Sequence, residues 1–269
     1  MKITLILPDL HHRVDQADKI IRHVEADEVI CLGDVFDDFN DYPEMVNHTA
    51  DWFVDFVNNP KHIFIAGNHD CHYGYDVGHL RCSGYAQWKS FIINDIVSRR
   101  DWEKMKFFHI LDGKWLLSHG GLHKFYLPKQ IADLHTNRPR FFNELEAYLT
   151  EESHKAFRES SWFTHAGHAR GGFQRVGGLT WCDFEREFYP IKGLNQIIGH
   201  TAQGIGFPKW CVFQDEKVAY YPQPQWTPSN TMLNDVNVSV NIDLDVSGNM
   251  HWATWDGENL RVFSCKNDL

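Results

Sequence analysis

Short apolar runs recur along the chain, and each ends at a small turn followed by side chains that could bind a ligand. The clearest run, residues 29–32, is uniformly apolar and too short for a buried helix. Such a run is typical of a parallel strand that is covered on both faces. It stops at Gly33, and the carboxylates Asp34 and Asp37 follow. Because open α/β sheets bind ligands at the carboxyl ends of their strands, this pattern predicts a functional site.

Four other apolar runs are built in the same way. They are residues 3–7, 62–66, 115–117 and 197–198. The turns that follow them carry Asp9, His11, Asn68, His69, Asp70, His119 and His200. Five strand ends are therefore expected to meet at one edge of a sheet. Oxygen ligands mixed with imidazoles suit divalent ions such as manganese, iron or zinc, and a shared carboxylate would make a two-metal site.

Helical periodicity separates the first strands. Apolar residues at positions 14, 17, 21 and 24 predict a helix after the first strand, and Pro43 opens a second helix that ends before Pro60. Four apolar residues predict a third helix and are expected to face the core: Tyr85, Trp88, Ile92 and Ile96. Strands that alternate with helices in this way predict an α/β arrangement.

From residue 107 onwards, antiparallel strands are predicted. Residues 107–111 and 114–118 flank Asp112-Gly113, which is a type I′ hairpin signal, so a second sheet begins here. Residues 211–221 are strand-like and precede the proline-rich residues 222–228. A closing pair of strands follows at residues 236–244 and 250–255, and then a turn and a strand at 260–264. The expected fold is α/β (α+β), a two-layer β-sandwich with flanking helices.

A single domain covering residues 1–269 is expected, because the candidate ligands run from Asp9 to His200 and must converge. Residues 122–160 are predicted to be helical in pieces, with breaks at Pro128 and Pro139. They would form an excursion from the domain. Residues 161–180 are rich in glycine and histidine and are predicted to form a long loop close to the site, where loops often carry specificity.

Composition narrows the class of protein. A hydrophobic fraction of 43%, with 10 Trp and 19 Phe, predicts a sizeable core. The formal net charge of −10 and the lack of a basic stripe argue against a nucleic-acid partner. No apolar segment reaches the roughly 18 to 20 residues of a membrane span, and no signal peptide is evident, so a cytoplasmic protein without a membrane partner is expected. The six cysteines form no C-x-x-C pair and are expected to be reduced.

The five turns form an ordered set of motifs. They are Asp9-x-His11, Gly33-Asp34-x-x-Asp37, Gly67-Asn68-His69-Asp70, His119-Gly120-Gly121 and Gly199-His200. This set resembles the signature of the calcineurin-like metallophosphoesterases, and the resemblance implies their fold. It also implies that Asp9, His11 and Asp34 bind one divalent ion, and that Asp34 bridges to a second ion held by Asn68, His119 and His200. His69, oriented by Asp37, would protonate the leaving-group oxygen.

Departures from the family pattern indicate which branch of the family the chain resembles. Ala202 stands where many members carry the second histidine of Gly-His-x-His. In this respect and in its His-Gly-Gly motif, the chain is most similar to the branch of serine/threonine protein phosphatases and bis(5′-nucleosyl)-tetraphosphatases. His12 and Asp38 replace the glycine and arginine usual in that branch, so a phosphate-gripping arginine is missing from its usual place. Arg170 and Arg175, in the glycine-rich loop, are candidate replacements by position.

The resemblance implies a hydrolase that uses two divalent ions, with manganese favoured and iron, zinc, nickel or cobalt as alternatives. A hydroxide bridging the metals would attack a phosphomonoester or a nucleoside polyphosphate, and the substrate would be a small molecule or a phosphoprotein. A phosphodiesterase or nuclease is a second hypothesis, which the acidic balance and Ala202 disfavour. A non-catalytic binding scaffold would predict lost ligands, but all the ligand positions are intact. Neighbouring residues able to bind metal are interpreted as surface or supporting groups: His12, Cys71, His72, His165 and His168.

Overall fold

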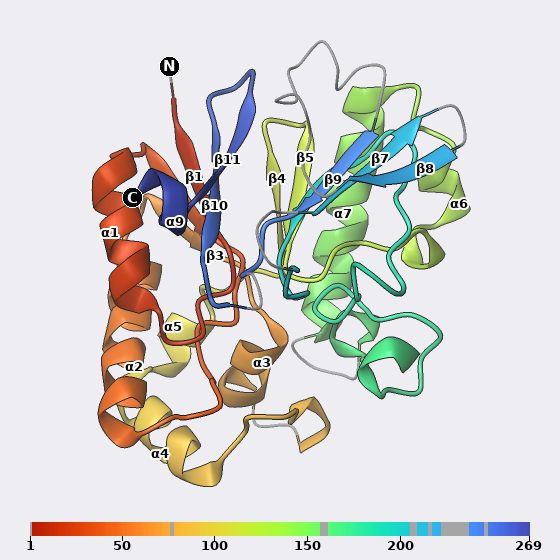
Figure 1. Cartoon of the computed structure of the whole chain (residues 1–269). Coiled ribbons are helices and arrows are strands. Elements are labelled where there is room, and N and C mark those ends of the chain that lie inside the picture. Colours follow the sequence, from red (N-terminus) through yellow and green to blue (C-terminus); the bar gives the residue numbers. More distant parts are fainter. Residues whose placement is uncertain are drawn as a thin grey trace.

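The computed structural model describes residues 2–75, 78–156, 161–204, 209–214, 217–221, 237–244 and 247–269. Two β-sheets face each other at the centre, and helices cover their outer faces (Figure 1). The strand order is β11-β10-β1-β2-β3 in the first sheet and β4-β5-β6-β9-β7-β8 in the second. This arrangement confirms the predicted α/β sandwich with flanking helices. The predicted proline-rich segment at 222–228 lies outside the described residues.

The first sheet is built around three parallel strands, β1 (Thr4–Leu7), β2 (Glu28–Cys31) and β3 (His62–Phe64). The predicted helices α1 (Val14–Val24) and α2 (Pro43–Asn58) connect them and cover the outer face. Successive side chains of a strand point to opposite faces. Leu5 and Leu7 accordingly pack with the helices, whereas Ile6 packs in the core between the two sheets. Burial on both faces explains why these strands are apolar throughout.

The third predicted helix is α4 (Gln87–Ile96), but its buried face differs from the expected one. Trp88 is 40% exposed, whereas Ile93 is fully buried and Lys89 is only 4% exposed. The Lys89 amine lies 2.5 Å from a carboxylate oxygen of Asp37 and 2.5 Å from one of Asp41. The prediction that Trp88 faces the core was therefore wrong, because the helix is turned to bury a lysine that apolar periodicity does not count. Two short helices flank this region, α3 (Asn68–Gly74) and α5 (Arg99–Trp102).

The second sheet begins with the predicted hairpin of β4 (Phe108–Leu111) and β5 (Trp115–Ser118). Asp112 has φ 53° and Gly113 has φ 61°, the two left-handed conformations that a type I′ turn requires. Parallel strands β6 (Asn195–Ile198) and β9 (Asn237–Asn241) continue the sheet from β5. The strand-like residues 211–221 form an antiparallel hairpin, β7 (Lys209–Gln214) and β8 (Lys217–Tyr221), at the edge.

The two predicted closing strands do not pair with each other. β9 lies between β6 and β7 in the second sheet, whereas β10 (His251–Trp255) lies between β1 and β11 (Leu260–Ser264) in the first. Hydrogen bonds fix the end of β9 to the second sheet: the Asn241 side chain donates to the Thr201 carbonyl at 2.7 Å, and the Ile242 amide donates to the Ile198 carbonyl at 2.9 Å. The chain must then cross between the sheets to reach β10. A short helix, α9 (Cys265–Asp268), follows β11.

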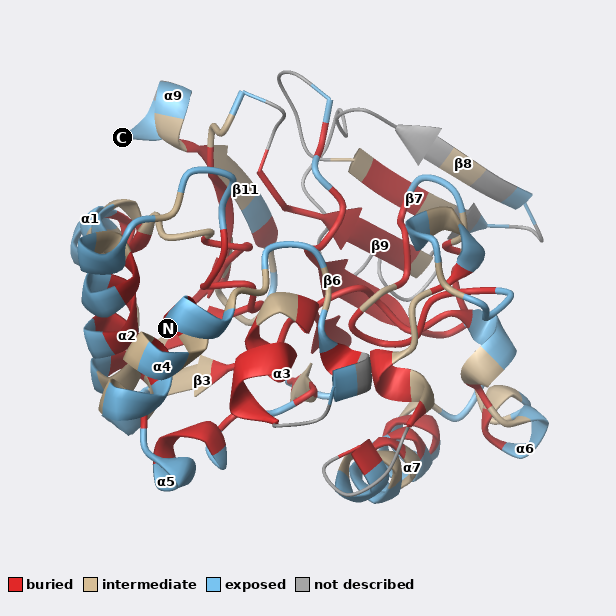
Figure 2. Cartoon of the chain, turned by 90° about the horizontal axis from the view of Figure 1, so that it is seen from below, coloured by how far each residue is buried: buried red, intermediate tan, exposed pale blue. Residues whose placement is uncertain are grey.

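The predicted excursion is helical in pieces, and both of its prolines lie at or beside the start of a helix. It consists of the turn Lys124–Tyr126, α6 (Lys129–Ala132) and α7 (Arg138–Ala156). Pro128 separates the first two elements, and Pro139 lies in the first turn of α7, which begins at Arg138 after the gap that follows α6. A proline is tolerated there because its missing N–H would have no partner within the helix. The apolar face of α7 is buried and its outer face is exposed (Figure 2). No helix in the described part of the chain combines the length and the apolar character needed to cross a bilayer.

Candidate metal centre

The predicted ligands lie at the carboxyl ends of strands from both sheets. The loops after β1 and β2 carry Asp9, His11 and Asp34, and Asn68 is the first residue of α3, shortly after β3. The loops after β5 and β6 carry His119 and His200. The expectation that these strand ends share one edge of one sheet was therefore wrong, because two facing sheets supply them. We call these six residues the carboxylate centre.

Four side chains of the carboxylate centre converge on one point. The Nε2 atom of His119 lies 3.2 Å from Oδ2 of Asp34, 3.1 Å from Oδ1 of Asn68 and 3.1 Å from Nδ1 of His200. The other ring nitrogen of His119 lies 2.8 Å from the Leu32 carbonyl, to which it can donate. Such a backbone partner fixes the ring and directs Nε2 toward the shared point.

A second group of potential ligands is formed by Asp9, His11 and again Asp34, with one ligand atom from each within 4.8 Å of the others. Nδ1 of His11 lies 2.5 Å from the Asp37 carbonyl, so its Nε2 is left for a ligand. Oδ2 of Asp9 accepts a hydrogen bond from the His200 amide at 2.9 Å. Within the described residues, Oδ1 of Asp9 and Nε2 of His200 are buried without a hydrogen-bond partner. Both atoms are therefore available to bind a cation.

Electrostatics also fit a cation in this centre. Burial, followed by repulsion from Asp243, raises the pKa of Asp9 well above its usual range. Burial alone would lower the pKa of His119, but Asp34 and Asp9 outweigh it and raise that pKa to about 10. A proton on His119 thus supplies positive charge among buried carboxylates. Divalent ions would supply that charge more fully, and the oxygen and imidazole donors present are those that such ions prefer.

His69 lies next to the centre and is held by Asp37. Its Nδ1 lies 3.0 Å from Oδ2 of Asp37, which also lies 2.9 Å from Nε2 of His72. The other oxygen of Asp37 accepts hydrogen bonds from the Tyr73 hydroxyl at 2.7 Å and from Lys89 at 2.5 Å. Burial would lower the pKa of His69, but Asp34 and Asp37 outweigh it and hold that pKa well above its usual range. The geometry therefore keeps His69 protonated and oriented.

Unusual backbone conformations gather at these turns. Of the seven non-glycine residues with positive φ in the described chain, five belong to the site: His11, His12, Asp34, Asp37 and His200. Gly33 has φ +100°, and a Cβ built on it would lie 2.4 Å from the Gly67 nitrogen, so only glycine fits where the two turns meet. The Asp70 carboxylate accepts hydrogen bonds from the amides of Asp34, Val35 and Gly67 at 2.8, 3.0 and 2.9 Å. Local strain of this kind is typical of functional sites.

Comparison with known proteins agrees with the motifs and the fold. Residues 3–204 match the family model described as calcineurin-like phosphoesterase. The chain belongs to the calcineurin-like phosphoesterase family. This phosphoesterase is accordingly a hydrolase of phosphoester bonds, and its family normally uses divalent metals.

Three solved structures are similar to the chain over 98% of its length. A candidate diadenosine tetraphosphatase is 13% identical (TM-score 0.48), over 98% of this chain and 93% of its own. A metallophosphoesterase from Sphaerobacter thermophilus is 14% identical (TM-score 0.47), over 98% and 87%. A protein serine/threonine phosphatase from Saccharomyces cerevisiae is 11% identical (TM-score 0.48), over 98% and 79%. No curated protein matches the chain.

A cavity of about 880 Å³ opens over the centre of the phosphoesterase, and the glycine-rich loop forms one of its walls, as predicted for residues 161–180. Arg170 of that loop lines the cavity. Its Nε lies 2.9 Å from Oδ2 of Asp183, and its Nη2 donates to the His200 carbonyl at 3.3 Å. Arg175 is exposed and is not among the described residues that line this cavity. The structure thus brings only the first of the two predicted arginines to the site.

Several cavity residues were missed in the sequence. Asp243 lines the cavity, is 3% exposed, and stands two positions after the end of β9, in which valines alternate with polar residues. A carboxylate shortly after a strand is a weaker form of the pattern that identified Asp34, because no uniform apolar run and no glycine precede Asp243. Arg13 and Arg81 also line the cavity. Arg13 stands two positions after His11, but nothing local distinguishes either arginine from a surface residue.

Proposed function

We propose that this phosphoesterase hydrolyses phosphomonoesters or nucleoside polyphosphates at a centre of two divalent ions. The observation that carries the proposal is the position of Asp34, whose carboxylate belongs to both ligand groups. Asp9, His11 and Asp34 would hold one ion, and Asp34, Asn68, His119 and His200 the other. Bound there, two divalent ions would neutralise phosphate charge and activate water. Because carboxylate, amide and imidazole donors dominate, we propose manganese as the first candidate.

His69 acts in this proposal as the general acid. Asp37 holds its Nδ1, so Nε2 is left to donate a proton to the departing oxygen. The raised pKa of His69 keeps that proton in place near neutral pH. Asn68, the residue before it, already presents its amide oxygen to the centre. In this proposal Asn68 therefore binds metal, whereas the adjacent His69 donates the proton.

Arginine side chains that line the cavity would bind the phosphate groups of the substrate. Arg170 is the first candidate, because its contacts with Asp183 and the His200 carbonyl fix the guanidinium beside the centre. Arg13 also lines the cavity, and its Nη2 is 3.8 Å from Oδ2 of Asp38. It supplies positive charge close to the place where the family's usual arginine is replaced by Asp38. Arg175 stays a second candidate, to be reached only by movement of its exposed loop.

An aromatic side chain favours a nucleotide among the possible substrates. Phe39 is 100% exposed and lines the cavity, as does its neighbour Asp38. An exposed phenyl ring next to a phosphate site can stack on a nucleobase, and such stacking contributes about 1–3 kcal/mol. We therefore propose nucleoside polyphosphates ahead of phosphoproteins.

The test is an activity screen of manganese-loaded protein with a phosphomonoester, a dinucleoside polyphosphate, a phosphopeptide and a bis-ester. We expect phosphate release to be fastest from the nucleotide, and to be lost after chelation. Phe39→Ala should slow the nucleotide reaction and leave the simple monoester unaffected. Hydrolysis of the bis-ester alone would contradict the proposal and favour a phosphodiesterase.

A further inference from the structure

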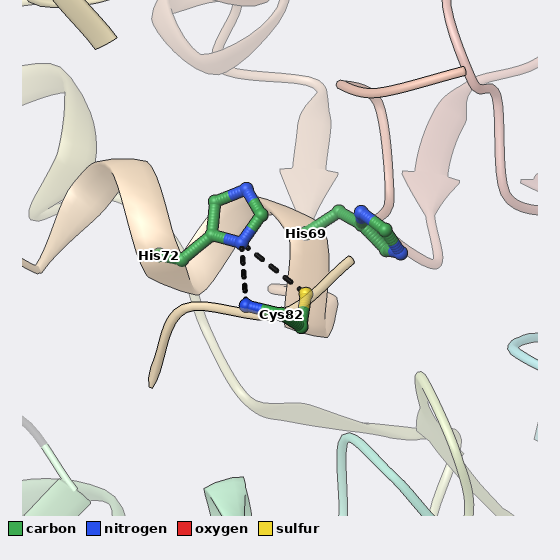
Figure 3. Close-up of side chains that lie close together, drawn as sticks. All are labelled: His69, His72 and Cys82. Carbon is green, nitrogen blue, oxygen red and sulfur yellow. Dashed lines mark hydrogen bonds between the residues drawn. The ribbon is translucent and has the colours of Figure 1, made fainter. Parts of the chain in front are cut away.

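A second group of metal-binding side chains lies beside the carboxylate centre. His69 and His72 lie three positions apart on α3 and therefore share one face of the helix. Cys82, from the segment after the turn Gly78–Leu80, lies across that face (Figure 3). One ring nitrogen of each histidine and Sγ of Cys82 lie within 4.8 Å of one another. We call these three residues the thiol cluster.

Contacts within the thiol cluster orient the ring of His72. Nδ1 of His72 lies 3.2 Å from Sγ of Cys82 and accepts a hydrogen bond from the Cys82 amide at 3.5 Å. The lone pair of that nitrogen is thus turned toward the Cys82 backbone, and the sulfur lies beside it. Nε2 of His72 lies 2.9 Å from Oδ2 of Asp37, within ion-pair distance but not aligned as a hydrogen bond. A carboxylate behind a ligand imidazole is the usual support of a metal-binding histidine.

The cluster has an open side. The His72 side chain is fully buried, that of His69 is 17% exposed, and both His69 and Cys82 line the catalytic cavity. An ion held by the three residues would keep a fourth position toward the cavity. Three protein ligands with one open position is a common arrangement for zinc.

The donor set differs from that of the neighbouring centre. One thiolate and two imidazoles suit zinc and similar ions, whereas manganese and magnesium prefer oxygen. We propose that the thiol cluster is an inhibitory site for zinc or a chemically similar ion, distinct from the two ions of the carboxylate centre. Binding would displace the thiol proton to solvent and occupy a nitrogen of His69.

The inhibitory consequence rests on the role proposed for His69, whereas the binding itself rests only on the three donors. A histidine that holds a metal cannot donate a proton to a leaving group. Zinc in excess of the catalytic ions would therefore slow the reaction without removing them. Substrates whose leaving groups need protonation would be affected most.

Binding is tested with cobalt, which reports a thiolate ligand through a near-ultraviolet charge-transfer band. Protein loaded with two equivalents of manganese is titrated with Co²⁺, in the unmodified chain and in the variants Cys82→Ser and Cys265→Ser. Cys265 is a half-buried cysteine on α9, outside the thiol cluster, and serves as the matched control. We expect a third equivalent and the band in the unmodified and Cys265→Ser proteins, and neither in Cys82→Ser. Absence of the band from the unmodified protein would overturn the proposal.

Inhibition is tested with zinc on the same three proteins, each compared with its own zinc-free rate. We expect the inhibition constant to rise at least about 10-fold in Cys82→Ser and to stay unchanged in Cys265→Ser. Equal inhibition of all three would mean that zinc acts by replacing manganese in the carboxylate centre, and would overturn the inhibitory site. A cobalt band without zinc inhibition would instead overturn the general-acid role of His69. If no substrate is hydrolysed but the band is present, the proposed function fails while the binding site stands.

Discussion

The carboxylate centre and the thiol cluster lie side by side but are chemically different. The first combines carboxylates, an amide oxygen and imidazoles, whereas the second has a thiol and two imidazoles. Asn68 contacts both: its amide oxygen lies 3.1 Å from Nε2 of His119, and its Nδ2 donates to Sγ of Cys82 at 3.6 Å. One turn of α3 thus serves two sets of donors. Because the two groups are adjacent, their donor atoms and not their place in the fold determine which ion each would prefer.

Asp37 connects the two groups. It contacts His69, which faces the carboxylate centre, and His72, which belongs only to the thiol cluster. Lys89 and Tyr73 hold its other oxygen. The proton donation proposed for His69 would therefore depend on a carboxylate that the thiol cluster shares. Substitutions on either side of Asp37 should therefore affect proton donation by His69 and metal binding by the thiol cluster separately.

The largest effect is expected from His69→Asn. If His69 protonates the leaving oxygen, alkyl phosphates should lose about 10²- to 10⁴-fold in kcat/KM, while aryl phosphates, whose leaving group needs little protonation, should lose much less. The two catalytic ions should stay bound. The measurement is kcat/KM for one alkyl and one aryl phosphate, together with metal content. An equal fall for both substrates would point to stabilisation of the phosphoryl oxygens, and metal loss would make His69 a ligand.

Lys89→Met should destabilise the fold by about 1–3 kcal/mol, because it leaves buried oxygens of Asp37 and Asp41 without their amine. Burial opposes the charge of Asp37, but His69 and His72 outweigh it and lower its pKa. A lowered carboxylate pKa contributes stability above the ordinary value of about 3.9 and loses it as pH falls through the folded-state value. The variant's deficit should therefore be full at pH 7 and shrink in strong acid.

Urea unfolding at pH 7 measures this deficit, with Lys19→Met as the matched control. Lys19 is exposed on α1, so its replacement should change stability by less than about 0.5 kcal/mol. Equal stability of the two variants would show that the Lys89 pair contributes nothing.

Asp243→Asn should weaken metal binding by about 10- to 100-fold, the usual cost of losing a supporting carboxylate. Asp243 is buried in the cavity wall, and its burial raises its pKa to about 7 although the Leu244 amide and His119 act in the opposite direction. The charged form of Asp243 would therefore be favoured over the neutral form only with a cation nearby. Calorimetric titration of the metal-free protein with Mn²⁺ measures the change. Unaltered affinity would remove Asp243 from the support of the carboxylate centre.

The smallest effect concerns the pH at which Cys82 reacts. Burial opposes its ionisation, but His69 and His72 outweigh it and lower the pKa to about 7. Alkylation by iodoacetamide should therefore level off just above pH 7, and at pH 7 it should be roughly threefold faster than for a free thiol of equal access. Cys71, on the same helix but 1% exposed and with a raised pKa, is the internal control and should not react. A rate for Cys82 that still rises beyond pH 9 would contradict this account.

The sequence predicted those parts of the site that have a local pattern. Asp34, Asn68, His119 and His200 each follow an apolar run and a turn, so strand ends could be found without knowing which sheet holds them. The pairing of β9 and β10 with different sheets depends on contacts between distant segments, which no local pattern records. The same holds for Lys89, which is buried because carboxylates of another segment surround its amine.

The central claim, that Asp34 joins two ions, is tested most directly by the metal content of Asp34→Asn. Elemental analysis after dialysis against manganese should find two ions per chain in the unmodified protein. In the variant we expect both sites to fall well below full occupancy, because each loses a charge that the other also needs. Cys82→Ser, treated identically, should keep its two ions. Two tightly held ions and normal turnover in Asp34→Asn would contradict the account.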